Sequence, residues 1–104
     1  MNKTKSNILL VEDDQVFAGA ITRAFNNRGF KSRHASSIEE TKDIIKNENF
    51  DFAILDLNLG GETSLKLIPI LKKSSNQTRI LILTGYASIA TAVEAIKLGA
   101  HNYL

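Results

Sequence analysis

The sequence predicts an α/β protein built on a doubly wound parallel sheet. Three short runs, residues 8–11, 52–55 and 80–83, are unbroken in apolar character rather than alternating, which is typical of strands buried on both faces. Segments with helical spacing of apolar residues separate these runs. Because parallel strands need crossover connections, the alternation of strand and helix predicts helices on both faces of one sheet.

The first half of the chain supplies two helices and an edge strand. Apolar residues recur at helical spacing over residues 17–25, and Gly29 follows as a C-terminal stop. Residues 31–35 are short and polar, which favours a weak strand at the edge of the sheet. Ser37 opens a capping-box pattern, which predicts a second helix reaching about Asn47.

The second half of the chain supplies two more helices and the start of a strand. Residues 67–71 predict a short third helix, in which Pro69 lies in the first turns or bends the helix. Residues 89–96 predict a fourth helix, followed by Gly99. Residues 102–104 resemble the opening of a fifth strand that the chain does not finish.

Composition bounds the function. The 104 residues fit one domain, with 43% hydrophobic residues for a core and a formal net charge of only +2, which argues against a nucleic-acid binder. The absence of cysteine excludes disulfides, thiolate metal sites and a cysteine nucleophile. No apolar run is long enough to span a bilayer, and the polar residues 1–6 lack the apolar core of a signal peptide. We therefore expect a single cytoplasmic domain, residues 1–104, with a flexible N-terminus at residues 1–6.

Acidic side chains follow two of the predicted buried strands. Glu12, Asp13 and Asp14 come after the first strand, Asp56 comes after the third, and Thr84 after the fourth. Ligands of open parallel sheets bind beyond the carboxyl ends of the strands, so we expect these side chains to converge.

Converging carboxylates repel one another, and a hard divalent cation relieves that repulsion. Mg²⁺ prefers oxygen ligands and is commonly held by one or two carboxylates together with a phosphoryl group. The chain has neither the GxxxxGK[ST] nor the GxGxxG motif, so we expect no nucleotide cofactor. A carboxylate can itself accept a phosphoryl group, which makes an aspartyl phosphate the predicted chemistry.

Simpler structural roles compete with these functional ones. Asp14 can cap the following helix, and Thr84 can be an ordinary hydroxyl at a strand end. We interpret His34 and His101 as surface or edge residues, because neither has partners at metal-ligand spacing. We interpret Lys72-Lys73 as a solvated helix end.

Three segments resemble the receiver domain of two-component response regulators: residues 8–14, 54–60 and 81–86. The stretch 83–104 is most similar to the RegA/PrrA/ActR group, in which a receiver is joined to a helix-turn-helix output domain. The resemblance implies a flavodoxin/CheY-like (βα)5 fold with strand order 2-1-3-4-5.

The resemblance also implies roles for the acidic residues. Asp56 would be the phosphoacceptor, taking a phosphoryl group from the phosphohistidine of a sensor histidine kinase. Mg²⁺ would be bound by Asp13, by Asp56, by the backbone carbonyl of Asn58, and by Glu12 through water.

Further positions in the resemblance concern signalling. Thr84 would contact the phosphoryl group, and Tyr103 would be the switch aromatic that turns inward with it. Asn58 and Tyr86 occupy the positions that tune the lifetime of the phosphoryl group. DNA would be bound only through an output domain outside this chain.

The chain departs from the family pattern in three places. The family's lysine would fall just beyond Leu104, and the fifth helix is missing, so we expect a truncated receiver that bares part of one sheet face. A homodimer or swapped oligomer would follow from that exposure. Gly60 stands where many receivers have proline, and Ser64 stands where glycine is usual.

Three function classes follow. The leading one is a signalling receiver that is not an enzyme beyond weak Mg²⁺-dependent self-phosphorylation and autodephosphorylation. The alternative is a pseudo-receiver, a protein-interaction module independent of phosphorylation. A phosphatase of the haloacid-dehalogenase type would need a second acid where Asn58 stands.

Overall fold

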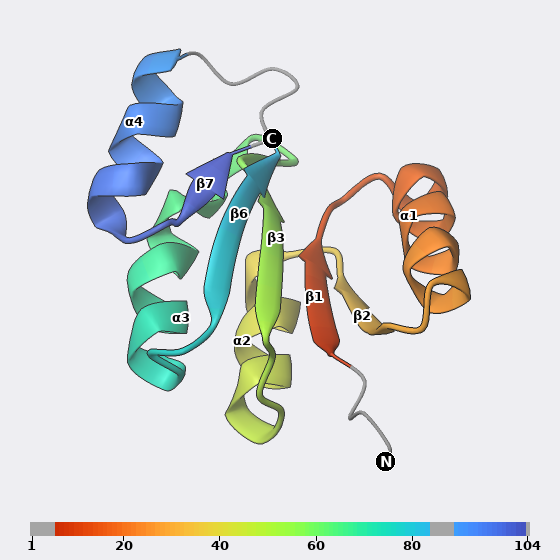
Figure 1. The fold of residues 1–104 in the computed structure, drawn as a ribbon. Helices are drawn as coiled ribbons and strands as arrows, with labels where there is room; N and C mark the ends of the chain where they lie inside the picture. The colour runs from red at the N-terminus through yellow and green to blue at the C-terminus, as the bar shows by residue number, and fades with distance from the viewer. Residues whose placement is uncertain (1–5, 84–88, 104) are drawn as a thin grey trace.

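The computed structural model describes residues 6–83 and 89–103, in which five strands form one parallel sheet in the order β2-β1-β3-β6-β7 (Figure 1). The strands are β1 (Asn7–Val11), β2 (Lys31–Ala35), β3 (Phe52–Asp56), β6 (Arg79–Leu83) and β7 (Asn102–Tyr103). Strands β4 (Asn58–Leu59) and β5 (Glu62–Thr63) form a separate antiparallel hairpin. Without that hairpin, the order is the predicted 2-1-3-4-5, and β2 is the predicted edge strand.

The helices cover both faces of the sheet, which confirms the doubly wound prediction. They are α1 (Gln15–Asn27), α2 (Ile38–Asn47), α3 (Leu67–Ser74) and α4 (Ile89–Leu98), with a 3-10 helix at Ser64–Lys66 before α3. Pro69 is the third residue of α3, so it lies in the first turn, where its missing N–H costs nothing. Among the described helices, none has the length and apolar character needed to cross a membrane.

Side-chain caps begin two of the helices where the sequence predicts. The carboxylate of Asp14 accepts a hydrogen bond from Phe17 N at 3.0 Å, and the hydroxyl of Ser37 accepts one from Glu40 N at 3.1 Å. Glu40 does not complete the capping box at Ser37. Its carboxylate accepts instead from the backbone N–H and the hydroxyl of Ser36, at 2.7 and 2.9 Å, and these bonds lower the pKa of Glu40.

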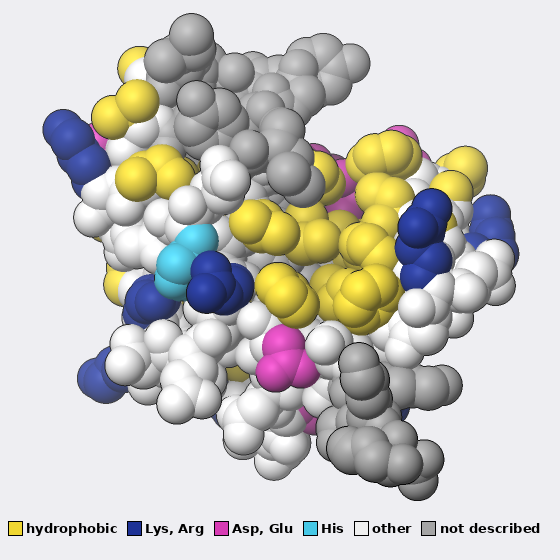
Figure 2. All heavy atoms as spheres, viewed as in Figure 1, with side chains coloured by type: hydrophobic (Ala, Val, Ile, Leu, Met, Phe, Trp, Pro, Cys, Tyr) yellow, Lys and Arg dark blue, Asp and Glu magenta, His cyan; other side chains and the backbone are white. Residues whose placement is uncertain are grey.

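Two apolar clusters lie on opposite faces of the sheet. The larger one joins the sheet to α2, α3 and α4, and it includes the fully buried Leu9, Leu55 and Ile82. The smaller one packs α1 against Leu10 and Ile54. On this second face, Figure 2 shows hydrophobic side chains gathered beside α1 over the middle of the sheet. The half-buried members contributed by the sheet are Phe52, Leu81 and Leu83.

His101 joins β6 to the segment leading into β7. Its backbone N–H donates to the carbonyl of Ile80 at 2.8 Å, and Ile80 N donates back to His101 Nδ1 at 3.1 Å. Because Nδ1 accepts a hydrogen bond, the ring proton lies on Nε2. Desolvation, followed by the charges of Lys72 and Arg79, lowers the pKa of His101. The predicted exposed place of His101 is confirmed, but its ring also completes a backbone pairing.

Our sequence analysis missed the β4–β5 hairpin. Its turn is Gly60-Gly61, and both glycines have positive φ, 59° and 89°. Two-residue hairpin turns that match the twist of the strands need positive φ at both positions, so a Gly-Gly pair is a recognised signature. The Gly-Gly pair was visible in the sequence. The strands that flank it are only two residues long, which is too short for an alternation of apolar and polar residues to indicate a strand.

Two glycine-to-alanine substitutions should change stability in opposite directions. Gly61→Ala puts a Cβ on a residue with φ of 89° and should lower the free energy of unfolding by about 1–2 kcal/mol. Gly19→Ala lies inside α1, where the new Cβ meets only an ordinary contact of 3.5 Å with Arg23, and should raise it by about 0.5–1 kcal/mol. Urea unfolding of both variants measures the two shifts. A free energy of unfolding that is unchanged or higher in Gly61→Ala would contradict the hairpin geometry.

Candidate functional site

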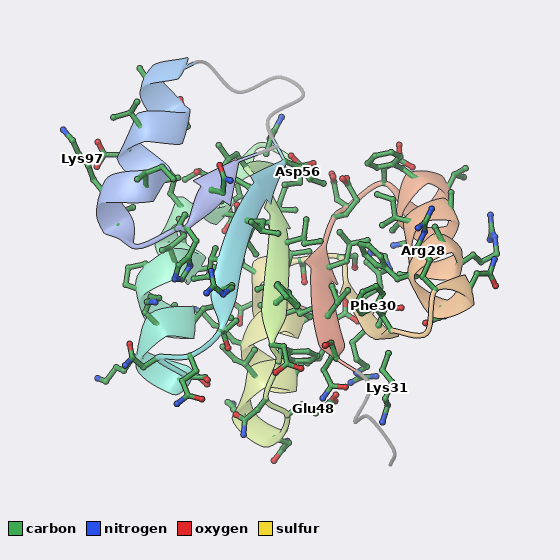
Figure 3. The ribbon with its side chains drawn as sticks, viewed as in Figure 1. Arg28, Phe30, Lys31, Glu48, Asp56 and Lys97 are labelled. Carbon is green, nitrogen blue, oxygen red and sulfur yellow. The ribbon has the colours of Figure 1, made fainter. Side chains whose placement is uncertain are left out.

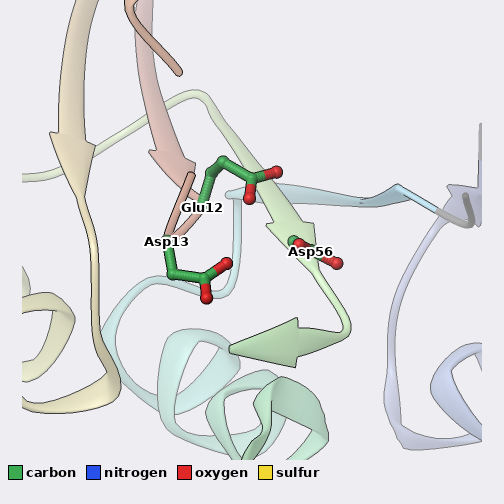
Figure 4. A group of neighbouring side chains, drawn as sticks. All are labelled: Glu12, Asp13 and Asp56. Atoms are coloured by element: carbon green, nitrogen blue, oxygen red, sulfur yellow. The ribbon is translucent and has the colours of Figure 1, made fainter. Parts of the chain in front are cut away.

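Three carboxylates meet at the carboxyl end of the sheet, the end at which Asp56 is labelled in Figure 3. Glu12 and Asp13 follow β1, and Asp56 ends β3. One oxygen atom from each of the three lies within 4.8 Å of the others. Figure 4 shows these side chains at the neighbouring ends of the two strands. The predicted convergence is therefore confirmed for Glu12, Asp13 and Asp56, whereas the carboxylate of Asp14 caps α1 instead.

Glu12 is the buried member of this cluster, with 4% of its surface exposed, whereas Asp56 is half-buried and Asp13 is exposed. Burial is the largest cause that raises the pKa of Glu12, and the neighbouring Asp56 and Asp13 add to it, bringing the pKa to about 7. A hydrogen bond of 3.1 Å from Asp14 N to Glu12 Oε2 opposes the rise. The site thus holds a carboxyl group whose charge is costly unless a positive charge comes close.

Asp56 is fixed by the segment that follows it. Its Oδ1 accepts a hydrogen bond from Asn58 N at 3.1 Å, and its backbone carbonyl accepts one from the hydroxyl of Ser64 at 2.7 Å. Ser64 is fully buried, and its own N–H donates to the carbonyl of Leu57 at 3.0 Å. The departure from the family pattern at Ser64 therefore has a structural role: its side chain ties the returning hairpin to the end of β3.

The turn of the β4–β5 hairpin lies against the acidic cluster. A Cβ built on Gly60 would be 3.7 Å from Asp13 Oδ2, and Gly61 N donates to Asn58 Oδ1 at 3.1 Å. The φ of 59° at Gly60 is one that proline cannot adopt, since its ring holds φ near −65°. The turn as it is built here therefore excludes the proline of many receivers, and glycine adopts this φ without strain.

His34 contacts the backbone of the site from the edge strand β2. Its Nε2 lies 2.6 Å from the carbonyl oxygen of Glu12, and because a carbonyl only accepts, Nε2 is the donor. Glu12 N in turn donates to the carbonyl of Ala35 at 3.0 Å. The predicted edge position of His34 is confirmed. Its contact with Glu12 was missed, because the two residues are 22 positions apart and no local pattern signals the pair.

Several predicted residues stay predictions. Thr84 and Tyr86 lie outside the described residues, as do residues 1–5 of the predicted flexible N-terminus. The backbone of Tyr103, in β7, pairs with that of Ile82 in β6, but the side chain of Tyr103 lies outside the description. The backbone carbonyl of Asn58 as a metal ligand likewise stays a prediction.

The donor set fits a hard divalent cation. All three groups offer carboxylate oxygens, which Mg²⁺ and Ca²⁺ prefer as ligands. Asp13 is exposed and Asp56 is half-buried, so solvent reaches the cluster beside the buried Glu12. A cation at this place would relieve the repulsion that contributes to the raised pKa of Glu12.

Comparison with known proteins agrees with this geometry. Residues 8–104 match the response regulator receiver domain family. The photosynthetic apparatus regulatory protein RegA of Rhodobacter capsulatus is 39% identical over 94% of this chain and 53% of its own length. The acid tolerance regulatory protein ActR of Sinorhizobium medicae is 40% identical over 94% of this chain and 50% of its own. The chain therefore spans about half the length of these curated relatives.

Solved structures give the same result. A response regulator protein from Burkholderia pseudomallei, crystallised with a phosphorylated aspartic acid, a calcium ion and citrate, is 45% identical, with a TM-score of 0.92 over 96% of this chain and 59% of that one. A CheY-like receiver domain protein from Methanospirillum hungatei is 26% identical, with a TM-score of 0.91 over 97% of this chain and 81% of that one.

The raised pKa of Glu12 predicts the pH dependence of stability without metal. Between pH 4.5, the ordinary pKa, and pH 7, the folded state holds more protons than the unfolded state, so this group's contribution to stability falls as pH rises. Over that window the loss should be on the order of 1–3 kcal/mol. Glu12→Gln should remove it.

Urea unfolding in EDTA at several pH values, compared between wild type and Glu12→Gln, isolates this contribution from those of Glu40 and His101. A difference between the two proteins that does not change with pH would show that Glu12 has an ordinary pKa.

Proposed function

We propose that this chain, which belongs to the response regulator receiver domain family, accepts a phosphoryl group on Asp56 from the phosphohistidine of a sensor histidine kinase. The observation that carries the proposal is the cluster of Glu12, Asp13 and Asp56, with oxygen atoms within 4.8 Å of one another. The phosphorylated aspartic acid in the Burkholderia pseudomallei relative supports it.

The transfer is a displacement at phosphorus. A carboxylate oxygen of Asp56 forms a bond to the phosphorus atom as the P–N bond to the kinase imidazole breaks, and the electron pair of that bond stays on the imidazole nitrogen. Because Oδ1 accepts from Asn58 N, Oδ2 is the oxygen we assign to the attack. Water later cleaves the acyl phosphate, releasing inorganic phosphate and restoring the carboxylate. Positioning does most of the work in such reactions.

Mg²⁺ is the cofactor we assign, with Asp13, Asp56 and the backbone carbonyl of Asn58 as ligands and Glu12 acting through water. When bound, the ion supplies positive charge beside the phosphoryl oxygens. Burial of Glu12 and the bonds that hold Asp56 keep these groups in place before a donor arrives. Preorganised groups need little rearrangement during transfer.

The output is a changed surface rather than a released product. In this proposal the hydroxyl of Thr84 bonds the new phosphoryl group, and Tyr103 follows it inward. The two states then differ in affinity for an output domain that binds DNA. A transcriptional role in the cytoplasm is part of this proposal, and the names of the relatives RegA and ActR, both regulatory proteins, support a regulatory role. The chain itself acts as a receiver, with only weak self-phosphorylation and autodephosphorylation.

Phosphorylation of Asp56 is tested by intact mass after incubation with Mg²⁺ and a small acyl phosphate donor. We expect a gain of one phosphoryl group that is lost in Asp56→Asn and without Mg²⁺, and that needs more Mg²⁺ in Asp13→Asn. Asp14→Asn is the matched control. It changes a neighbouring acid outside the cluster, and asparagine keeps the cap of α1, so this variant should react like wild type. No gain in the wild type would favour the pseudo-receiver.

Self-association is expected from the open sheet face. Phe52, Leu81 and Leu83 are only half-buried on the side where α1 packs, and burying apolar surface favours a homodimer or a swapped oligomer. Size-exclusion chromatography with light scattering should show a mass that rises with concentration, and Leu81→Lys should reduce it. A monomer at all concentrations would contradict this expectation.

A further inference from the structure

We propose that the groove between α2 and α3 is a docking site for an acidic amphipathic helix of a partner protein. The groove has a volume of about 380 Å³. Its lining is made of two isoleucines, three lysines and one serine, namely Lys42, Ile45, Lys46, Ile70, Lys73 and Ser74. This surface is separate from the phosphoacceptor cluster, and the inference does not rest on the proposed function.

The floor of the groove is apolar and firmly held. Ile45 of α2 is buried in the larger core cluster, and Ile70 of α3 is half-buried against the same cluster. The hydroxyl of Ser74 makes only a long contact, 3.5 Å, with the backbone carbonyl of Ile45, so the packing of both isoleucines in the core is what holds the floor. A floor held by the core in this way is a surface that a partner can meet without rearrangement.

The rim of the groove is positively charged. Lys42 and Lys46 contact acidic residues only within α2, Glu39 at 3.8 Å and Asp43 at 3.5 Å. Such exposed pairs within one helix contribute little and exchange readily for a partner's carboxylates. For Lys73, no carboxylate lies within 4 Å of Nζ among residues 6–83 and 89–103.

The apolar floor and the positively charged rim together indicate which kind of partner fits the groove. A third helix packs into the groove between two helices by placing side chains from successive turns on the floor. Apolar residues at positions i and i+4 of that helix would contact Ile45 and Ile70. Glutamates or aspartates on either side of them would lie beside Lys42, Lys46 and Lys73. The charge complementarity therefore points to an acidic amphipathic helix rather than to a basic one.

The groove lies at the opposite end of the sheet from the acidic cluster. Helices that connect parallel strands run against them, so the last turns of α2 and α3 lie beside the start of the strands (Figure 1). Figure 3 shows Glu48, the residue after α2, at the lower end of the sheet and Asp56 at the upper end. A helix bound in the groove would thus leave the phosphoacceptor accessible.

The experiment uses a synthetic helical peptide with leucines at i and i+4 flanked by glutamates, titrated into the ¹⁵N-labelled chain. Saturable shifts of amide signals should map to α2 and α3. Lys73→Glu should weaken binding about fivefold or more, since one attraction becomes a repulsion. Lys97→Glu is the matched control, because it makes the same charge change on α4 (Figure 3) and should leave binding unchanged. The spectrum of each free variant verifies its fold.

Three results would overturn the proposal. The first is an absence of saturable shifts at millimolar peptide. The second is equal weakening by Lys73→Glu and Lys97→Glu, which would mean attraction to net charge alone. The third is shifts confined to α1 and the open sheet face, which would mean that the peptide only covers exposed apolar surface. Asp56→Asn should bind the peptide like wild type, so this test and that of phosphorylation fail independently.

Discussion

The parallel register of β1 with β3 is the constraint on which the acidic edge depends. Val11 pairs with Leu55 in that register, so the next residues, Glu12 and Asp56, lie at the same level. Gathering carboxylates there costs free energy, as the raised pKa of Glu12 reports. The buried aliphatic side chains of the two strands offset that cost, since each contributes roughly 1.5–3 kcal/mol. A slip by one residue would turn Asp56 to the other face, so the core that holds the register also holds the site.

Much of this arrangement could be predicted because it depends on patterns of residues that are close together in the sequence. Unbroken apolar runs indicated the central strands, and the acids directly after them indicated the site. The contacts that complete the site could not be predicted in the same way. His34 meets the backbone of Glu12 only because β2 pairs with β1, and Ser64 meets the carbonyl of Asp56 only because the hairpin turns back. Such contacts depend on tertiary structure, and no spacing in the sequence encodes them.

The two ends of the sheet carry different kinds of side chain, and its two faces are covered to different extents. The carboxyl ends of the strands carry the acids, while the opposite end carries the last turns of α2 and α3 with their lysines. One face is closed by three helices, and the other is covered by α1 with half-buried side chains beside it. A domain arranged in this way can present different surfaces to different partners at once. In the proposed function, Asp56 does not have to compete with every other contact for the same surface.

The run Glu12, Asp13 and Asp14 looks redundant as composition, yet each carboxylate has its own task. The first accepts from Asp14 N, the second faces the turn at Gly60, and the third caps α1. The length of this linker also sets the rotational phase of the helix. Deleting one residue would turn α1 by about 100° relative to the strand. Ala18, now fully buried against the sheet, would then leave it. Single deletions here should therefore be far less tolerated than substitutions, even substitutions that remove a charge.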